Sequence, residues 1–366
     1  MGGLFGVFSK TDCVEDAFYG TDYHSHLGTK RGGLAIKNTG GFQRFIKDIT
    51  TSQFRSKFDR DIKKMHGNKG IGVISDYEDQ PLIISSQLGT FAIATVGKIN
   101  NLEELASKAL QNGTHFSEMH GSEINPTEMV ATIISQKNTF EEGIQKVQKM
   151  IEGSCTMLIL TDEGIYAARD KFGRTPLVIG EKPGSYAIAM ESCAFPNLGY
   201  DITKYMGPGE IILINDNGIN QLVPPGDKLQ ICSFLWVYYG YPASNYEGIN
   251  VEAVRYKCGA YLSKEEDIEI DLVAGIPDSG TAHGLGYSNE AHKPYARPFV
   301  KYTPTWPRSF MPQKQSIRDT VAKMKLIQIK ELISDKRLLF CEDSIVRGTQ
   351  LRRQIEKLFE SGAKEV

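Results

Sequence analysis

The sequence contains little cysteine and no excess of either charge, and both facts exclude classes of protein. Six cysteines occur among 366 residues, without a CxxC pair, which argues against a disulfide-stapled secreted scaffold. Lys and Arg number 42 and Asp and Glu 44, so no uniform basic field exists for a nucleic-acid backbone or an anionic membrane. No apolar run reaches the roughly 18 residues of a membrane span. We therefore expect a cytoplasmic protein that binds neither nucleic acid nor membrane.

The first part of the chain, up to about residue 225, is rich in short strands separated by turn residues. At about 150 residues per domain, the length of 366 residues predicts two domains. Two helices are expected in this first part, at Asn101–Gln111 and Thr127–Glu152. The pattern favours sheets in a layered sandwich covered by helices. The expected strands are Gly3–Ser9, Gly33–Lys37, Gly70–Ser75, Thr90–Val96, Thr156–Thr161, Gly164–Arg169, Tyr186–Met190 and Gly209–Asn215.

The second part alternates strands with helices. A helix at Asn250–Leu262 precedes the apolar run Ile268–Ile276, and the strand Leu338–Cys341 precedes a helix at Gln350–Glu360. Such alternation predicts a parallel α/β sheet, whose ligands bind beyond the carboxyl ends of the strands.

The segment Arg337–Thr349 carries the strongest chemical signal. A buried strand delivers two adjacent carboxylates, Glu342 and Asp343, to a short polar loop that opens a helix. Backbone N–H groups at such a position bind phosphate, and the hydroxyls of Ser344 and Thr349 add donors. The two acids suit sugar hydroxyls or Mg²⁺ instead. Together these groups predict a site for a ribose 5-phosphate.

A second loop, Ile276–Ala282, also ends a strand and opens a helix. It offers another backbone nest, suited to pyrophosphate. Either loop alone would fit an acidic residue that caps a helix, but two of them in one parallel sheet favour a doubly phosphorylated sugar.

The segment Leu338–Thr349 resembles the phosphoribosylpyrophosphate (PRPP) motif of type I phosphoribosyltransferases. Its core, Asp-Ser-Ile-Val-Arg-Gly-Thr, resembles that of the glutamine PRPP amidotransferases in particular. The resemblance extends over nearly the whole chain. Further matching segments are Pro277–Gly280 with Gly286 and Tyr287, Gly248–Val251, Asp170–Leu177, Glu191–Phe195 and Gly207–Glu210.

This resemblance implies an α+β glutaminase domain of the Ntn-hydrolase type, a four-layer αββα sandwich, over residues 1–230. An α/β type I phosphoribosyltransferase domain with a mostly parallel sheet would follow over residues 231–366. In the family, glutamine releases ammonia in the first domain, and ammonia displaces pyrophosphate from C1 of PRPP in the second. The product is 5-phosphoribosylamine, an intermediate of purine biosynthesis. The resemblance also implies Mg²⁺, a homo-oligomer, and purine nucleotides as inhibitors.

The resemblance assigns PRPP binding to both loops and to basic residues between them. Ser279, Glu342 and Asp343 are also implied as Mg²⁺ ligands, with Glu342 standing where the family has an aspartate. A flexible loop, Phe299–Phe310, keeps its basic residues but carries two prolines and Trp306 outside the usual pattern. The implied PRPP-binding residues are Asp278, Ser279, Gly280, Lys301, Arg308, Lys325, Glu342, Asp343, Ser344, Ile345, Val346, Arg347, Gly348 and Thr349.

The glutaminase half departs from the family at its nucleophile. The family uses a cysteine whose own amino group acts as the base. Gly2 stands at that position, and a glycine cannot attack an amide. Cys13 is a poor substitute, because the glycine-containing turn that should follow the nucleophile precedes it.

Four further segments of the glutamine pocket have also changed. The His-Arg-Gly-Gln-Glu segment aligns with Gly28–Gly32, and the segment with the carboxylate-binding arginine aligns with Gly72–Asp76. The oxyanion-hole segment becomes Val96–Lys98, and the amine-binding segment becomes Asn125–Glu128. The sequence therefore predicts a silent glutaminase domain that is retained as a scaffold.

The cysteines give one further hypothesis. Cys232 aligns with the first ligand of a 4Fe-4S cluster in one branch of the family, whose other ligands lie beyond residue 366. Such a cluster requires a longer chain, and the family does continue with a strand and helices after the segment that matches Gln350–Glu360. We therefore expect an incomplete transferase domain. The other cysteines on apolar segments are expected in the core: Cys155, Cys193, Cys258 and Cys341.

Two functional hypotheses remain open at this point. The first is an amidophosphoribosyltransferase-like glycosyltransferase that binds PRPP and Mg²⁺ and uses ammonia or an amine. The second is a non-catalytic paralogue that binds PRPP or nucleotides and regulates an active amidotransferase.

Overall fold

The structure is a computed structural model that describes residues 2–120, 123–265, 268–302, 326–345 and 349–366. The chain forms two compact units. Unit 1 comprises Met1–Cys232 with Asn245–Gly248, and unit 2 comprises Ser233–Ser244 with Ile249–Val366. None of the helices in these described ranges is both long and apolar enough to cross a membrane.

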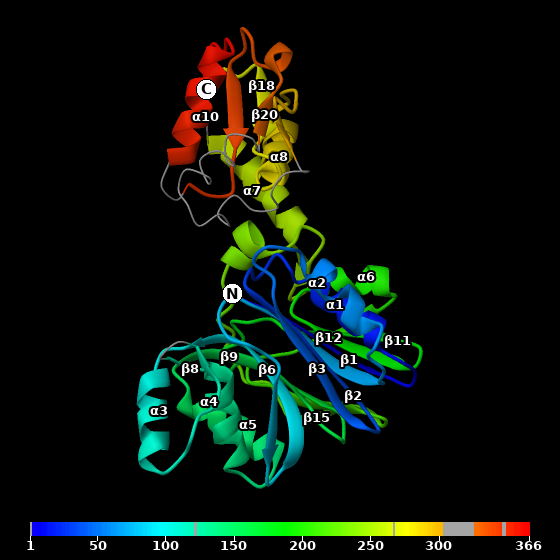
Figure 1. The fold of residues 1–366 in the computed structure, drawn as a ribbon. Coiled ribbons are helices and arrows are strands. Elements are labelled where there is room, and N and C mark those ends of the chain that lie inside the picture. Colours follow the sequence, from blue (N-terminus) through cyan, green and yellow to red (C-terminus); the bar gives the residue numbers. More distant parts are fainter. Residues whose placement is uncertain (1, 121–122, 266–267, 303–325, 346–348) are drawn as a thin grey trace. The chain divides into compact units, whose positions relative to one another are not determined.

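Unit 1 contains two antiparallel sheets (Figure 1). The seven-stranded sheet has the order β13-β11-β12-β1-β4-β2-β3, and the six-stranded sheet has the order β15-β14-β10-β9-β6-β5. The first consists of β1 (Gly3–Ser9), β2 (Arg31–Asn38), β3 (Gly41–Asp48), β4 (Lys69–Ser75), β11 (Val178–Lys182), β12 (Ser185–Ala189) and β13 (Asp201–Tyr205). The second consists of β5 (Leu82–Ser86), β6 (Gly89–Ile99), β9 (Gly153–Leu160), β10 (Ile165–Ala168), β14 (Ile211–Asn215) and β15 (Gly218–Val223). Two short strands, β7 (Met119–His120) and β8 (Glu123–Ile124), pair antiparallel with each other.

Three hydrophobic cores make unit 1 a four-layer αββα sandwich. One core lies between the sheets, with Leu4 and Ile71 from the first sheet packed with Leu158 and Ile212 from the second. A second core joins the first sheet to helices α1 (Val14–Asp22) and α2 (Phe54–Ile62). The third joins the second sheet to α3 (Leu102–Gln111), α4 (Pro126–Ser135) and α5 (Phe140–Met150) (Figure 1). The predicted αββα fold of the first part is confirmed.

The single helix expected over Thr127–Glu152 is wrong, because two helices occupy this range. The helix α4 ends at Ser135, and α5 begins at Phe140. Thr139 is in an extended conformation, and its hydroxyl accepts a hydrogen bond from the backbone N–H of Glu142 at 3.2 Å. This cap starts a new helix. The helices α1, α2 and the short α6 (Phe195–Leu198), which follows the 3-10 turn η1 (Ser192–Ala194), were not expected.

Unit 2 is built around two parallel strands. The strand β18 (Leu272–Gly275) pairs with β21 (Leu338–Cys341), with Leu272 opposite Leu338 and Gly275 opposite Cys341. The helices are α7 (Val251–Glu265), α8 (Thr281–Ala291) and α10 (Thr349–Glu360), which confirms the three helix–strand alternations that the sequence predicted. Smaller elements are η2 (a π-helix, Leu235–Tyr239), β19 (Phe299–Lys301), β20 (Leu326–Gln328) and η3 (Lys330–Leu332). The short strand β17 (Ile249–Asn250) precedes α7, and the short strand β16 (Asn245–Tyr246) belongs to unit 1.

Candidate functional site

The two predicted phosphate loops leave the sheet of unit 2 at the same edge. Because β18 and β21 are parallel and in register, Ile276 and Glu342 begin their loops side by side. The backbone N–H of Ile276 donates to the carbonyl of Cys341 at 2.9 Å. The site therefore lies beyond the carboxyl ends of the strands, where α/β sheets bind their ligands.

Gly280 permits the close approach of the loop Ile276–Gly280 to β21. A Cβ atom at Gly280 would collide with the backbone carbonyl of Cys341, so a larger residue would push the two loops apart. Within this loop, the N–H of Gly280 donates to Ile276 at 2.8 Å, and the N–H of Thr281 donates to Asp278 at 3.2 Å. These bonds make a tight turn that leads directly into α8.

Ser279 and Glu342 connect the two loops. The hydroxyl of Ser279 donates to Oε1 of Glu342 at 2.6 Å, and the backbone N–H of Asp343 donates to the same oxygen at 3.0 Å. Burial, together with the neighbouring Asp343 carboxylate, raises the pKa of Glu342 to about 7, whereas the hydrogen bond from Ser279 opposes this shift. A carboxyl group with a pKa near 7 is a frequent sign of a functional site.

The remaining described residues of the predicted site lie on the two loops, at the end of β19 and at the start of α10. The hydroxyl of Ser344 contacts Oδ1 of Asp343 at 3.2 Å, and Ile345 is exposed. The ammonium group of Lys301, at the end of β19, pairs with Asp278 at 2.6 Å. The backbone of Thr349 opens α10. The predicted residues Arg308, Lys325, Val346, Arg347 and Gly348 lie outside the described residues.

The donor set of this site fits Mg²⁺. Glu342 and Asp343 offer carboxylate oxygens and Ser279 a hydroxyl oxygen, and Mg²⁺ prefers one or two carboxylates together with substrate phosphates and water. In the part of the chain that the structure describes, no group of three or more His, Cys, Asp or Glu residues gathers as a preformed metal cage. The site thus suits a metal that takes its other ligands from a phosphorylated substrate.

Sequence patterns did not reveal the groups that lie behind the loops. His283, on α8, is buried, and its burial together with the nearby Arg255 guanidinium lowers the pKa of the imidazole, whereas Asp343 opposes this shift. Arg255, on α7, donates to the carbonyls of Trp236 and Gly240, each at 2.9 Å. The two helices pack closely, because a Cβ atom at Gly259 would collide with the backbone of His283. A histidine and an arginine on separate helices leave no local signal in the sequence.

In the glutaminase-like unit, the atoms around Gly2 leave no room for a side chain. A Cβ atom at this position would lie 2.5 Å from the backbone carbonyl oxygen of Ile74 and 3.1 Å from Cγ2 of Val96. The next residue, Gly3, is similarly confined by the side chain of His24. The backbone of the neighbouring strand therefore occupies the space that a nucleophilic side chain at position 2 would need.

The positions that align with the family's glutamine-binding groups serve structural contacts. Asp76 accepts from the N–H of Thr29 at 2.7 Å and from its hydroxyl at 3.0 Å. The hydroxyls of Thr127 and Thr95 are 2.7 Å apart and buried. Glu128 accepts bonds from the backbone of two residues before α4, at 2.9 Å each, and Asn125 caps α4. These side chains are held within the fold.

Cys13 does not replace the missing nucleophile. Cys13 is buried, and burial raises the pKa of its thiol far above the usual range, with Asp12 and Asp16 adding to the increase. A thiol in this state is not reactive. Cys232, the candidate cluster ligand, is exposed. Of the cysteines expected in the core, Cys155, Cys193 and Cys341 are buried, and Cys258 is half-buried.

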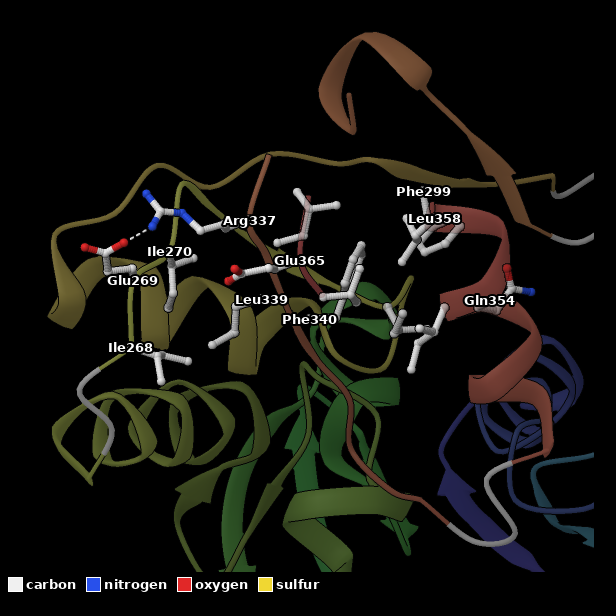
Figure 2. Close-up of a pocket in the computed structure, with 14 residues that line it drawn as sticks. Ile268, Glu269, Ile270, Phe299, Arg337, Leu339, Phe340, Gln354, Leu358 and Glu365 are labelled. Atoms are coloured by element: carbon white, nitrogen blue, oxygen red, sulfur yellow. Dashed lines mark hydrogen bonds and ion pairs between the residues drawn. The ribbon is translucent and has the colours of Figure 1, made fainter. Parts of the chain in front are cut away.

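A separate cavity of about 610 Å³ in unit 2 has a mostly apolar lining (Figure 2). Leu338, Leu339 and Phe340 of β21 and Leu358 of α10 contribute to it, and Arg337 pairs with Glu269 at its edge (Figure 2). Among the predicted PRPP-binding residues that the structure describes, none lines this cavity. The phosphate loops, rather than this cavity, are therefore the candidate site.

Comparison with known proteins agrees with the geometry of both units. A model of the glutamine amidotransferase domain matches residues 68–197. The amidophosphoribosyltransferase of Bacillus subtilis is 30% identical over 377 residues, covering 100% of this chain and 77% of the relative. That of Methanocaldococcus jannaschii is 30% identical over 394 residues, covering 100% of this chain and 82% of the relative.

Two solved structures resemble the whole chain. One is described as the allosteric regulatory enzyme of purine biosynthesis, with a TM-score of 0.89, 29% identity, and coverage of 100% of this chain and 79% of its own. The other is the glutamine PRPP amidotransferase of B. subtilis in complex with ADP and GMP, with a TM-score of 0.89, 29% identity, and coverage of 100% and 80%. Three observations agree: unit 1 is an antiparallel sandwich, unit 2 has parallel strands with two loops, and the similarities extend over the whole chain. The chain therefore belongs to the amidophosphoribosyltransferase family.

Proposed function

We propose that this protein is a PRPP- and Mg²⁺-dependent phosphoribosyltransferase that uses ammonia or an amine and does not hydrolyse glutamine. The observation that carries the first part is the meeting of two phosphate loops at one sheet edge, linked by Ser279 and Glu342 at 2.6 Å. Backbone N–H groups lie beside carboxylates there, and PRPP presents phosphates beside ribose hydroxyls. With ammonia as the acceptor, the product is 5-phosphoribosylamine.

In this proposal each loop binds one end of PRPP. The loop Ile276–Gly280 holds the pyrophosphate, and the N-terminus of α10 with Ser344 holds the 5-phosphate. Glu342 and Asp343 accept from the ribose hydroxyls or bind Mg²⁺, which supplies charge neutralisation for the departing pyrophosphate. Lys301 exchanges its partner Asp278 for a phosphate oxygen.

The reaction needs few chemical groups from the protein. The nitrogen of the acceptor forms a bond to C1 as the bond from C1 to the pyrophosphate oxygen breaks, and the acceptor then loses a proton. Positive charge develops on the ribose ring, so the protein contributes mainly through positioning and exclusion of water.

The absence of glutamine hydrolysis rests on the surroundings of Gly2. A nucleophilic thiol needs a Cβ atom, and the carbonyl of Ile74 would lie 2.5 Å from it. Asp76, Thr127 and Glu128 are engaged within the fold and do not form clamps for a free amino acid. Each lost charge-assisted contact would weaken glutamine binding by about 1.5 to 3 kcal/mol.

The test is incubation of the full chain with PRPP, Mg²⁺ and ammonium chloride, followed for pyrophosphate and phosphoribosylamine. We expect product with ammonium and none with glutamine. Asp343→Asn should lower pyrophosphate release at least about tenfold, because a charged group at the substrate is lost. Glu331→Gln, which changes an exposed carboxylate on η3, is the matched control and should retain activity.

Two outcomes would overturn the proposal. Glutamine-dependent product would show that the first domain is active. Mg²⁺-dependent PRPP binding without pyrophosphate release, for ammonium and a panel of primary amines, would establish the regulatory paralogue instead.

A further inference from the structure

Two buried histidines occupy the same position relative to a preceding backbone carbonyl, but only one of the two rings bonds to it. His24 is fully buried, and its Nδ1 lies 2.7 Å from the carbonyl oxygen of Gly20, four residues earlier. His283, on α8, is 6% exposed, and Ser279 of the pyrophosphate loop stands four residues before it. Although the Nδ1 of His283 is buried, none of the described residues forms a hydrogen bond with it. A buried polar atom without a partner is rare and calls for an explanation.

The carbonyl of Ser279 is the natural partner for this ring. Side chains on an α-helix lean toward its N-terminus, so the ring of His283 leans back over the turn that contains Ser279. Within the described part of the chain, no backbone N–H donates to the carbonyl of Ser279, whereas the next carbonyl, that of Gly280, accepts from the N–H of Gly284 at 2.9 Å. A donor and an acceptor four residues apart are thus both open where the loop joins the helix.

The charge state of the ring suits a bond to a carbonyl. Burial and then the Arg255 guanidinium lower the pKa of His283, while the backbone of Ser279 and the carboxylate of Asp343 oppose this shift. The imidazole is therefore neutral at pH 7 and has one N–H to donate. In His24 the same kind of ring donates from Nδ1 to the carbonyl four residues earlier.

The open bond lies at the part of the loop that substrate must engage. The hydroxyl of Ser279 donates to Glu342 at 2.6 Å, and both side chains belong to the candidate Mg²⁺ site. A metal that takes oxygen ligands from these groups changes the hydrogen bonds of Ser279, and with them the orientation of its peptide groups. Hydrogen bonds at functional sites are often open in the free protein and close only when the ligand binds.

We propose that His283 is a positioning residue for the pyrophosphate loop: its Nδ1–H donates to the carbonyl of Ser279 when PRPP and Mg²⁺ bind. The bond satisfies a buried donor that the free protein leaves unpaired, so it favours the loop conformation that holds the ligand. His283 itself touches neither PRPP nor the metal. All of these groups belong to unit 2. The inference rests on the proposed function for the identity of the ligand, but it requires binding only, without turnover.

The test is nuclear magnetic resonance of the full chain, labelled with ¹⁵N at its seven histidines. Ring nitrogen resonances distinguish protonated from unprotonated nitrogens and respond to hydrogen bonding, and loss of a signal in His283→Gln assigns His283. We expect PRPP with Mg²⁺ to move the Nδ1 signal of His283 to that of a protonated, hydrogen-bonded nitrogen. Pyrophosphate with Mg²⁺ should act in the same way, because it occupies the same loop. The signal of His24, whose bond is already made, should not move.

Two substitutions of His283 separate the bond from the mere volume of the ring. His283→Asn keeps an N–H donor near the place of Nδ1, whereas His283→Gln carries its amide farther out, near the place of Nε2. We expect His283→Gln to weaken PRPP binding and raise KM about fivefold, the effect of one neutral hydrogen bond, with kcat unchanged. His283→Asn should stay close to wild type. The matched control is His292→Asn at the exposed end of the same helix, where Asn tolerates the left-handed backbone.

Three results would overturn the inference. They are an Nδ1 signal of His283 that neither ligand moves, a bond already formed in the free chain, and an equal loss of affinity in His283→Asn and His283→Gln. If His283→Gln does not fold, His283→Asn provides the assignment, and the wild-type resonances decide. A chain in which PRPP moves the signal but ammonium releases no pyrophosphate contradicts the proposed function and leaves the role of His283 supported.

Discussion

At the scale of single residues, His24 shows how the fold fixes a protonation state. Its Nδ1 lies 2.7 Å from the carbonyl of Gly20, and its Nε2 accepts from the N–H of Glu191 at 3.1 Å. The ring therefore carries its proton on Nδ1, and a second proton would face a donor. Burial lowers the pKa of His24 to about 4, although the Glu191 carboxylate opposes the shift.

This lowered pKa predicts a loss of stability in acid. Between about pH 6.5 and pH 4 the unfolded chain binds a proton at His24 that the folded chain does not, so the free energy of unfolding falls as the pH decreases. From pH 7 to pH 5 the loss of stability is about 2 kcal/mol, because a difference of one pKa unit corresponds to about 1.4 kcal/mol.

Urea unfolding of wild type and His24→Gln at both values of pH measures this loss. The variant should lose less stability than wild type, and exposed His66→Gln should match wild type; equal pH dependence in all three contradicts the assignment.

Gly2 gives a prediction about the lost nucleophile. Gly2→Cys should not restore glutamine hydrolysis, because the new Cβ atom would press on the backbone carbonyl of Ile74 and the glutamine clamps would still be missing. We also expect it to destabilise unit 1 by about 1 to 3 kcal/mol, as overpacking does. Ammonia release from glutamine is the measurement, after mass spectrometry confirms that Met1 has been removed and the amino group of the introduced cysteine is free. Hydrolysis by this variant would mean that only the thiol had been missing.

The residues that the sequence could not predict are those whose partners are remote. The sequence was sufficient to identify Glu342, Asp343 and Ser344, because one strand and the loop that follows it carry them together. The contact of His24 with Glu191 joins positions 167 residues apart, and that of Tyr246 with Glu191 joins positions 55 apart. Only the three-dimensional fold brings these groups together.

At the scale of elements, strand–loop–helix units could be predicted because their signals are local. The strand β21 and the helix α10 each carry their own hydrophobic pattern, and the acids between them exclude continuation of the strand. The break between α4 and α5 also has a local signal. Thr139 and Glu142 have the spacing of a capping box, which marks a helix start inside the range expected to be one helix.

The turn before α8 leads to a prediction for Gly280. Gly280→Ala should weaken PRPP binding at least about tenfold, because its methyl group would collide with the carbonyl of Cys341 and separate the two phosphate loops. Gly226→Ala is the matched control, since its Cβ atom would meet only an ordinary contact, 3.7 Å from the carbonyl of Pro208. Titration calorimetry with PRPP and Mg²⁺ measures both variants. Unchanged affinity of Gly280→Ala would mean that the close approach of the loops does not matter for binding.

At the scale of the whole molecule, the order of elements was sufficient to predict the two architectures. Many short strands followed by alternating strands and helices permit few arrangements, and the sandwich and the parallel pair are among them. The order of the strands within each sheet could not be predicted in this way. The central position of β1 between β4 and β12 depends on the pairing of Phe5 with Gly72 and with Ala189, which no local pattern encodes.

The separate cores predict two unfolding transitions that respond differently to ligands. Unit 1 is stabilised by three cores that involve both sheets and their helices, whereas unit 2 has smaller clusters around β18 and β21. PRPP with Mg²⁺ binds only folded loops of unit 2, so at about 100 times its dissociation constant it should stabilise that unit by about 2.7 kcal/mol.

Urea unfolding followed by Trp236 emission in a Trp306→Phe background, which removes the chain's second tryptophan, reports unit 2, and exchange of the β1 and β9 amides reports unit 1. We expect PRPP to move the first signal to higher urea with little effect on the second, and glutamine to move neither. A shift of the β1 and β9 signal by glutamine would show that unit 1 still binds it, which would contradict the confinement of Gly2 and the engagement of Asp76 as causes of its loss.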